Sequence, residues 1–219
     1  IKKLGLPQPH SYININESKI DLNTGIINFP VILKPRWGMG SIGIYKAECE
    51  EELDLFYKKL QHEIFDTYLK YESAVDASSC IIIQEVIQGQ EYGIEVFNDL
   101  KGNYVTTLAK RKVAMRAGET DIAEVIDPKD FSSLGKLISD NLRHIVNLDV
   151  DVFVSPNGEK IVREMNCRFG GQYPFSHLAG ANFPKQIIDW CEGKKNDIAN
   201  LTTRPILACK ELNPVIIKG

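Results

Sequence analysis

The pair Asn157-Gly158 constrains the fold more tightly than any other feature of this sequence, because Asn-Gly is the strongest short signal for a two-residue hairpin turn. Residues 149–155 and 160–166, on either side of it, alternate between apolar and polar side chains, which is typical of strands. With a two-residue turn, the numbers of facing residues add up to 315. The sequence therefore predicts an antiparallel hairpin of known register.

In this register, Asp151 faces Glu164 and Asp149 faces Asn166, and all four side chains lie on one face of the sheet. Facing Cβ atoms are about 5 Å apart, so two like charges repel unless a cation lies between them. Oxygen donors of this kind suit Mg²⁺, and Arg168 could reach phosphate groups bound to the same ion. The alternative is a solvated acidic face. The opposite, buried face would be supplied by Val150, Val152 and Val154.

Three glycines, Gly38, Gly40 and Gly43, match the G-x-G-x-x-G dinucleotide pattern, but they lead into a strand-like segment at 42–45 and not into a helix. A Rossmann site is therefore not predicted, and no Gly-Lys-Ser/Thr follows as in a Walker loop. A glycine loop between two strands can still cradle phosphate with its backbone N–H groups, with Lys34 adding positive charge. The alternative is a glycine-rich surface turn with a solvated lysine.

The remaining pattern mixes both kinds of element and predicts an α+β chain in two lobes that meet near residue 88. Further strands are expected at 29–34, 80–83, 92–97 and 103–109, and helices at 50–69, from Asp127 with Pro128 in first position, and at 184–192. The second of these helices would bury the stripe Phe131, Leu134, Ile138, Leu142 and Ile145.

Composition excludes several classes of function. The 219 residues carry a net charge of −3, which gives no electrostatic case for binding nucleic acid or an anionic membrane, and no apolar run is long enough to span a bilayer. Five scattered cysteines without metal-site spacing indicate reduced thiols and a cytoplasmic protein. Residues 1–5 read like the end of a helix, so we expect the chain to begin inside a longer protein.

Three motifs in order carry a resemblance to a known family. Lys34-Pro35 before the glycine loop, the segment 84–91 (QEVIQGQE) and the segment 164–168 (EMNCR) resemble the ATP-grasp superfamily, and within it the carbamoyl-phosphate-synthase-like members. The resemblance covers about residues 1–193. It implies an α+β ATP-grasp fold, in which two lobes with antiparallel sheets grip ATP between them.

The resemblance also implies a domain plan. Residues 1–88 would form the small lobe with a mobile glycine lid, 89–195 the large lobe with the metal hairpin, and 196–219 a C-terminal extension. The family usually carries an α/β domain before these lobes, with a further phosphate-binding cation. Both are absent from these 219 residues and are expected in the full-length protein.

The family's functional residues carry over by position. ATP would be bound by Lys34, by the backbone around Gly38, Gly40 and Gly43, by an adenine hinge of Glu85, Val86 and Ile87, and by Glu91 on the ribose. Two Mg²⁺ ions, or Mn²⁺, would be held by Asp151, Glu164 and Asn166, with Glu164 bridging. Arg168 would contact the transferring γ-phosphoryl group, and Arg116 matches a basic position near the phosphates.

The implied function is an ATP- and Mg²⁺-dependent carboxylate–amine ligase, an enzyme that makes an acyl phosphate and joins it to an amine or another nucleophile. Its partners would be small-molecule carboxylates and amines, and it could form a homodimer. Two alternatives remain open: an ATP-binding module without turnover, and a phosphotransferase of the same fold.

Overall fold

The computed structural model describes residues 1–38 and 42–212, which form two compact units. The smaller unit is Gln8–Gln88, and the larger unit is Ile1–Pro7 together with the described residues from Gly89 onward. The first seven residues, expected in the small lobe, belong instead to the larger unit. Leu6 is buried in its core, and the Pro7 carbonyl accepts a hydrogen bond from the Val162 amide at 2.8 Å.

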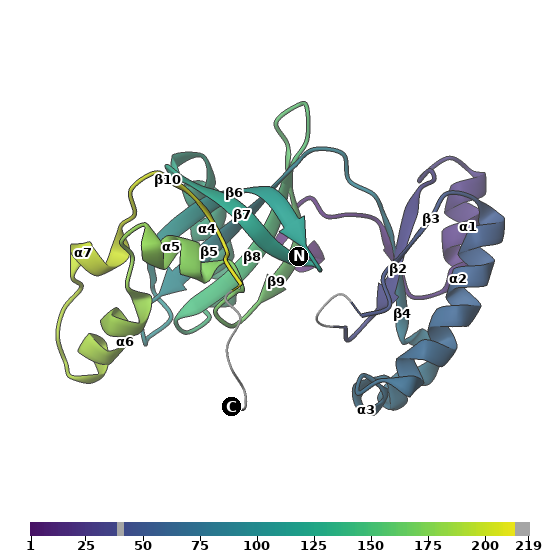
Figure 1. Ribbon diagram of the computed structural model, residues 1–219, viewed down its shortest axis with the longest axis horizontal. Helices are drawn as coiled ribbons and strands as arrows, with labels where there is room; N and C mark the ends of the chain where they lie inside the picture. The colour runs from purple at the N-terminus through teal and green to yellow at the C-terminus, as the bar shows by residue number, and fades with distance from the viewer. Residues whose placement is uncertain (39–41, 213–219) are drawn as a thin grey trace, which may run out of the picture. The chain divides into compact units, whose positions relative to one another are not determined.

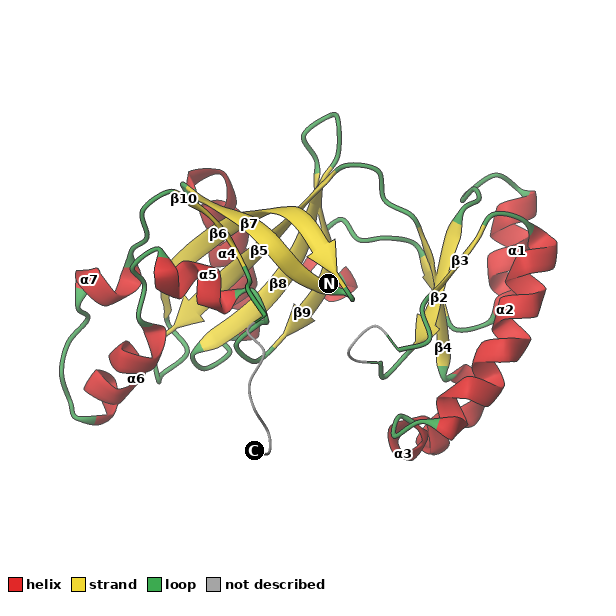
Figure 2. Cartoon of the chain, in the orientation of Figure 1, coloured by secondary structure: helices red, strands yellow, loops and turns green. Residues whose placement is uncertain are grey.

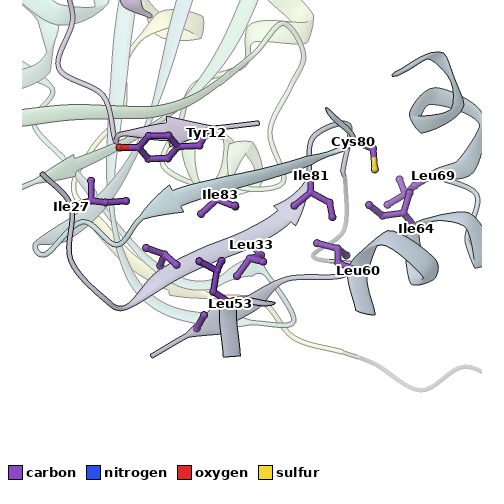
Figure 3. Close-up of a cluster of buried hydrophobic side chains, with 12 residues drawn as sticks. Tyr12, Ile27, Leu33, Leu53, Leu60, Ile64, Leu69, Cys80, Ile81 and Ile83 are labelled. Carbon is purple, nitrogen blue, oxygen red and sulfur yellow. The ribbon is translucent and has the colours of Figure 1, made fainter. Parts of the chain in front are cut away.

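The smaller unit is an antiparallel sheet, ordered β1-β4-β2-β3, with helices packed on it (Figure 1). In β2 alternate residues Val31 and Leu33 are fully buried, as period-two patterning requires, and they share a core cluster with residues of α2. Figure 3 shows Leu33 in this cluster with Leu53 and Leu60 of α2. The elements are β1 (Ser11–Tyr12), α1 (Ile15–Asn23), β2 (Val31–Pro35), β3 (Tyr45–Ala47), α2 (Glu50–Glu63), α3 (Lys70–Ser73) and β4 (Ile81–Glu85), with 3-10 turns at Ile64–Asp66 and Ala74–Ser79.

The larger unit contains an antiparallel sheet ordered β10-β7-β6-β5-β8-β9 (Figure 2). One face packs on α4 through Val96, Val150, Phe131 and Ile138, and the other face is partly covered by α5 and α6. The elements are a 3-10 turn at Lys2–Leu4, β5 (Gln90–Asn98), β6 (Tyr104–Arg116), β7 (Glu119–Ile126), α4 (Lys129–Leu142), β8 (Asn147–Val154), β9 (Lys160–Asn166), α5 (Tyr173–Leu178), α6 (Phe183–Cys191), α7 (Ile198–Leu201) and β10 (Ile206–Cys209).

Two sequence expectations change at α4. The helix begins at Lys129, with Pro128 at the cap, while the Asp127 carboxylate accepts the Lys129 amide at 3.0 Å. The helix ends at Leu142, and the left-handed Arg143 reverses the chain. Ile145 lies beyond the end of the helix and is exposed, and Leu142, the last residue of the helix, is also exposed, so neither is part of the buried stripe.

The end of the chain contributes to the sheet. Residues 196–219 were expected as an extension, yet β10 pairs antiparallel with β7 through Leu207 opposite Glu124. β7 itself, β10 and α1 were not predicted. In the described part of the chain, no helix is long and apolar enough to cross a membrane.

His144 gives the larger unit a stability that depends on pH. Its Nε2 lies 3.0 Å from the Val96 carbonyl, its Nδ1 is buried without a partner among the described residues, and burial lowers the pKa of the ring. A lowered folded pKa means that the unfolded chain binds the proton first, so this stability is present above about pH 6.5 and lost as the pH falls below it.

We expect the free energy of unfolding, measured by urea denaturation, to decrease from pH 7 toward pH 5 with a slope that His144→Gln reduces. The exposed His62 supplies the control, since His62→Gln should leave the slope unchanged. A His144→Gln slope equal to that of the wild type would contradict the assignment.

Candidate active site

The hairpin β8–β9 pairs the acidic residues as predicted, but its turn is longer than predicted and one strand contains a bulge. Asp151 faces Glu164 and Asp149 faces Asn166. Near the turn, however, Val154 faces Lys160, and the Ser155 amide donates to the Glu159 carbonyl at 3.0 Å, so the loop has three residues, 156–158, and not two. Its last residue, Gly158, has φ 85°, as a three-residue hairpin loop requires.

A β-bulge at Arg163 restores the predicted register. Asp151 pairs with Glu164 and the next residue, Val152, pairs with Val162, which leaves Arg163 unpaired in β9. Bulges redirect side chains, and here the guanidinium lies on the acidic face, 3.3 Å from an oxygen of Asp151 and 3.5 Å from an oxygen of Glu91. The bulge and the longer turn each shift the register by one residue, and the two shifts cancel.

A second cation that the sequence analysis missed, Lys112, lies in the same cluster. Its Nζ is 2.7 Å from both Glu91 Oε1 and Asp151 Oδ1, and its side chain is only 6% exposed. The cations that we expected near Asp151 and Glu164 therefore include side chains of the protein: Lys112 and Arg163 contact Asp151, and Arg163 Nη2 also lies 3.9 Å from Glu164. The sequence predicted that this strand ends at 109, whereas β6 continues to Arg116 and includes Lys112. Recognising the longer strand in the sequence would have placed Lys112 in the sheet.

The three predicted metal ligands nevertheless share one sheet face. Glu164 is about half exposed, and its carboxylate accepts a hydrogen bond from the side-chain amide of Asn166 at 2.8 Å. Asp151 is more buried, with 17% of its side chain exposed. Residues 1–38 and 42–212 contain no group of three or more His, Cys, Asp or Glu side chains arranged to hold an ion. Two carboxylates and an amide oxygen form a donor set that suits Mg²⁺, which takes one or two carboxylates together with phosphates and water.

The two predicted arginines occupy different surroundings. Arg168 follows β9, and its Nη1 donates to Asp149 at 2.7 Å, leaving 55% of the side chain exposed. Arg116 ends β6 and pairs with Asp121 at 2.5 Å beside a tight turn. The structure therefore places Arg168 directly beside the acidic hairpin and gives Arg116 a partner of its own.

In the smaller unit, Lys34 lies on β2 opposite Ile82 of β4 and is partly buried. The chain turns after it, with the Gly38 amide donating to Pro35 at 3.2 Å. Gly43 has φ 65°, and a Cβ there would lie 2.6 Å from Leu60, so this position requires glycine. Gly40 lies outside the described residues.

The predicted adenine hinge follows β4. Glu85 is the last residue of the strand, and its carboxylate accepts the His10 amide at 2.8 Å, while Val86 and Ile87 continue without regular structure and are partly buried. Glu91 lies in β5 of the larger unit, with 16% of its side chain exposed, bound to Lys112 as described above.

Comparisons with known proteins support a single family. A D-alanine–D-alanine ligase from Marinomonas sp. (strain MWYL1) is 30% identical over 97 residues, which is 44% of this chain and 26% of that protein. Two solved structures share the fold. One is the biotin carboxylase domain of Hydrogenobacter thermophilus 2-oxoglutarate carboxylase with MgADP and bicarbonate (TM-score 0.72, 19% identity, 89% of this chain and 44% of that chain). The other is the beta-gamma-ATP complex of Campylobacter jejuni biotin carboxylase (TM-score 0.70, 19% identity, 92% of this chain and 46% of that chain).

This chain spans about a quarter of the curated relative and less than half of each of these solved chains. The model of the ATP-grasp domain family matches residues 27–174. That match includes Lys34, the glycine loop, the hinge segment and the whole acidic hairpin, and it covers more than half of the sequence. The chain belongs to the ATP-grasp family.

Proposed function

We propose that this chain carries the nucleotide- and metal-binding residues of a carboxylate–amine ligase that depends on ATP and Mg²⁺. The observation that carries the proposal is the β8–β9 hairpin, where Asp151 faces Glu164, Asn166 shares their sheet face, and Arg168 follows two residues later. Within the family, the motifs are most similar to those of carbamoyl-phosphate-synthase-like members, and this subclass is part of the proposal.

Asp151, Glu164 and Asn166 would hold two Mg²⁺ ions, because their oxygen donors suit this ion. When bound, the ions supply positive charge to the β- and γ-phosphates. Asp151 would then exchange one of its present cation partners, Lys112 or Arg163, for a metal ion.

The protein's other groups bind and orient the nucleotide. Lys34 would contact the phosphates, the segment 85–87 would hold the adenine, and Glu91 would accept the ribose hydroxyls. Arg168 is exposed and carries a fixed charge, so its guanidinium would neutralise negative charge on the γ-phosphoryl group as that group transfers.

The reaction proceeds in two displacements. An oxygen of the acceptor carboxylate attacks the γ-phosphorus, the bond to the bridging oxygen breaks, and ADP leaves with that electron pair. The amine then attacks the acyl carbon of the acyl phosphate, loses a proton and expels inorganic phosphate, which leaves an amide. Positive groups are needed in the first step because two anions must approach each other.

The test is calorimetry of the pure chain with ATP. We expect binding with Mg²⁺ or Mn²⁺ and strongly weakened binding in excess chelator, because the phosphates would otherwise face Asp151 and Glu164 without an ion between them. Equal affinity in chelator would contradict the metal assignment.

A second measurement separates the ligase from the two alternatives. ADP release that requires both a carboxylate and an amine supports the ligase. Release that requires only an acceptor hydroxyl supports a phosphotransferase, and binding without release under any acceptor supports a module that does not turn over.

A further inference from the structure

The carboxylate of Asp149 is held by two donors at once. It lies on β8 with the residue only 7% exposed, and it faces Asn166 across the hairpin. Arg168 Nη1 donates to Oδ2 at 2.7 Å, and Gln172 Nε2 donates to Oδ1 at 2.7 Å. Because each oxygen has its own partner, the carboxylate group has one preferred orientation.

Two glycines make room for this arrangement. A Cβ on Gly170 would lie 2.3 Å from the Asp149 carboxylate, and a Cβ on Gly93 would lie 1.6 Å from the Gln172 amide oxygen. Real Cβ atoms do not approach that closely, so neither position accepts a side chain without displacing the pair. Gln172 is 4% exposed and its Oε1 has no hydrogen-bond partner among the described residues. The amide is therefore held by packing as well as by Asp149.

The hydrogen bond from Arg168 to Asp149 restricts the conformations of the Arg168 side chain. Its side chain is 55% exposed, and an exposed arginine otherwise samples many rotamers, at a cost in conformational entropy whenever it must adopt one of them. The contact with Asp149 uses Nη1 and leaves the other nitrogens of the guanidinium free of Asp149. A charged group that is already oriented loses less entropy on meeting its ligand.

We propose that Asp149, oriented by Gln172 between Gly93 and Gly170, is a positioning residue that holds the Arg168 guanidinium ready for the γ-phosphate of ATP. The proposal rests on the proposed function for its ligand, and it assigns to Asp149 and Gln172 a role distinct from that of the metal-binding residues.

The test uses binding of two nucleotides to the full chain in Mg²⁺, a non-hydrolysable ATP analogue and ADP, by calorimetry. Asp149→Asn keeps the size of the side chain and removes its charge. We expect it to weaken binding of the ATP analogue by about tenfold, since a charge-assisted hydrogen bond is worth at least that much, and to leave ADP binding unchanged. Glu124→Gln is the control, because it removes the partner of Arg111 in the same sheet, at 2.7 Å, and should change neither affinity.

A double-mutant cycle shows whether Asp149 acts through Arg168. Arg168→Gln should itself weaken binding of the ATP analogue, and adding Asp149→Asn to it should have little further effect. An equal loss of affinity in the presence and absence of Arg168, or equal losses for ADP and the ATP analogue, would overturn the proposal while leaving the proposed function in place. A wild-type chain that binds neither nucleotide would instead overturn both.

Discussion

Replacing Glu164 with Gln is expected to reduce phosphoryl transfer by about 10²-fold or more, because the change removes one negative charge from the predicted bridging ligand of the two ions. The amide has nearly the same volume as the carboxylate. Glu164 is about half exposed, accepts a hydrogen bond from the side-chain amide of Asn166 and lies 3.9 Å from Arg163, so the fold should persist. The measurement is ADP release in Mg²⁺ against a panel of carboxylates and amines, with thermal unfolding recorded on the same samples.

Glu159 provides a matched control, because it is an exposed glutamate on the same hairpin, beside the turn and outside the acidic cluster. Glu159→Gln should release ADP at the wild-type rate. If Glu164→Gln instead unfolds the protein and retains wild-type activity per folded molecule, the role of Glu164 is structural and the metal assignment fails.

The largest loss of stability is expected from Lys110→Met. Lys110 and Glu95 form an ion pair in the larger unit with both side chains fully buried, and Lys110 Nζ also donates to Ser176 at 3.0 Å. Burial already raises the pKa of Glu95, and Lys110 opposes that rise. Without the lysine, an unpaired carboxylate remains in the interior, which costs about 3–5 kcal/mol in the free energy of unfolding. Urea denaturation at neutral pH measures this loss.

Two further variants make the experiment specific. The double variant Lys110→Met with Glu95→Met removes both charges and should recover most of the lost stability, because no buried charge is left without a partner. Lys136→Met removes one partner of the exposed pair with Asp140, and it should change stability by less than about 1 kcal/mol. Equal destabilisation in the single and double buried variants would show that Lys110 contributes by packing alone.

Local signals in the sequence predicted much of the candidate site. Asn157-Gly158 and the alternating residues beside it identified the hairpin, and the pairing of Asp151 with Glu164 was confirmed. The strand that carries Lys34 was also predicted within two residues of its observed bounds. These features depend on the pleat of a strand and on neighbours close in sequence, which a single sequence displays directly. The roles of the site residues in binding ATP and metal stay predictions.

Only the tertiary structure showed the counter-ions of the acidic cluster and the partners of Asp149. Lys112 reaches Asp151 across β5, from a strand about 40 residues earlier, and Gln172 enters through the space that Gly93 leaves open. The bulge at Arg163 has no signature in the sequence, and its effect on register was hidden by the longer turn. The sequence alone determined which residues alternate along each strand of the hairpin and where the chain turns. Which charged side chains meet was decided by the order of the strands and by the approach of segments distant in sequence. Those contacts depend on the packing of the whole sheet, which no short stretch of sequence displays.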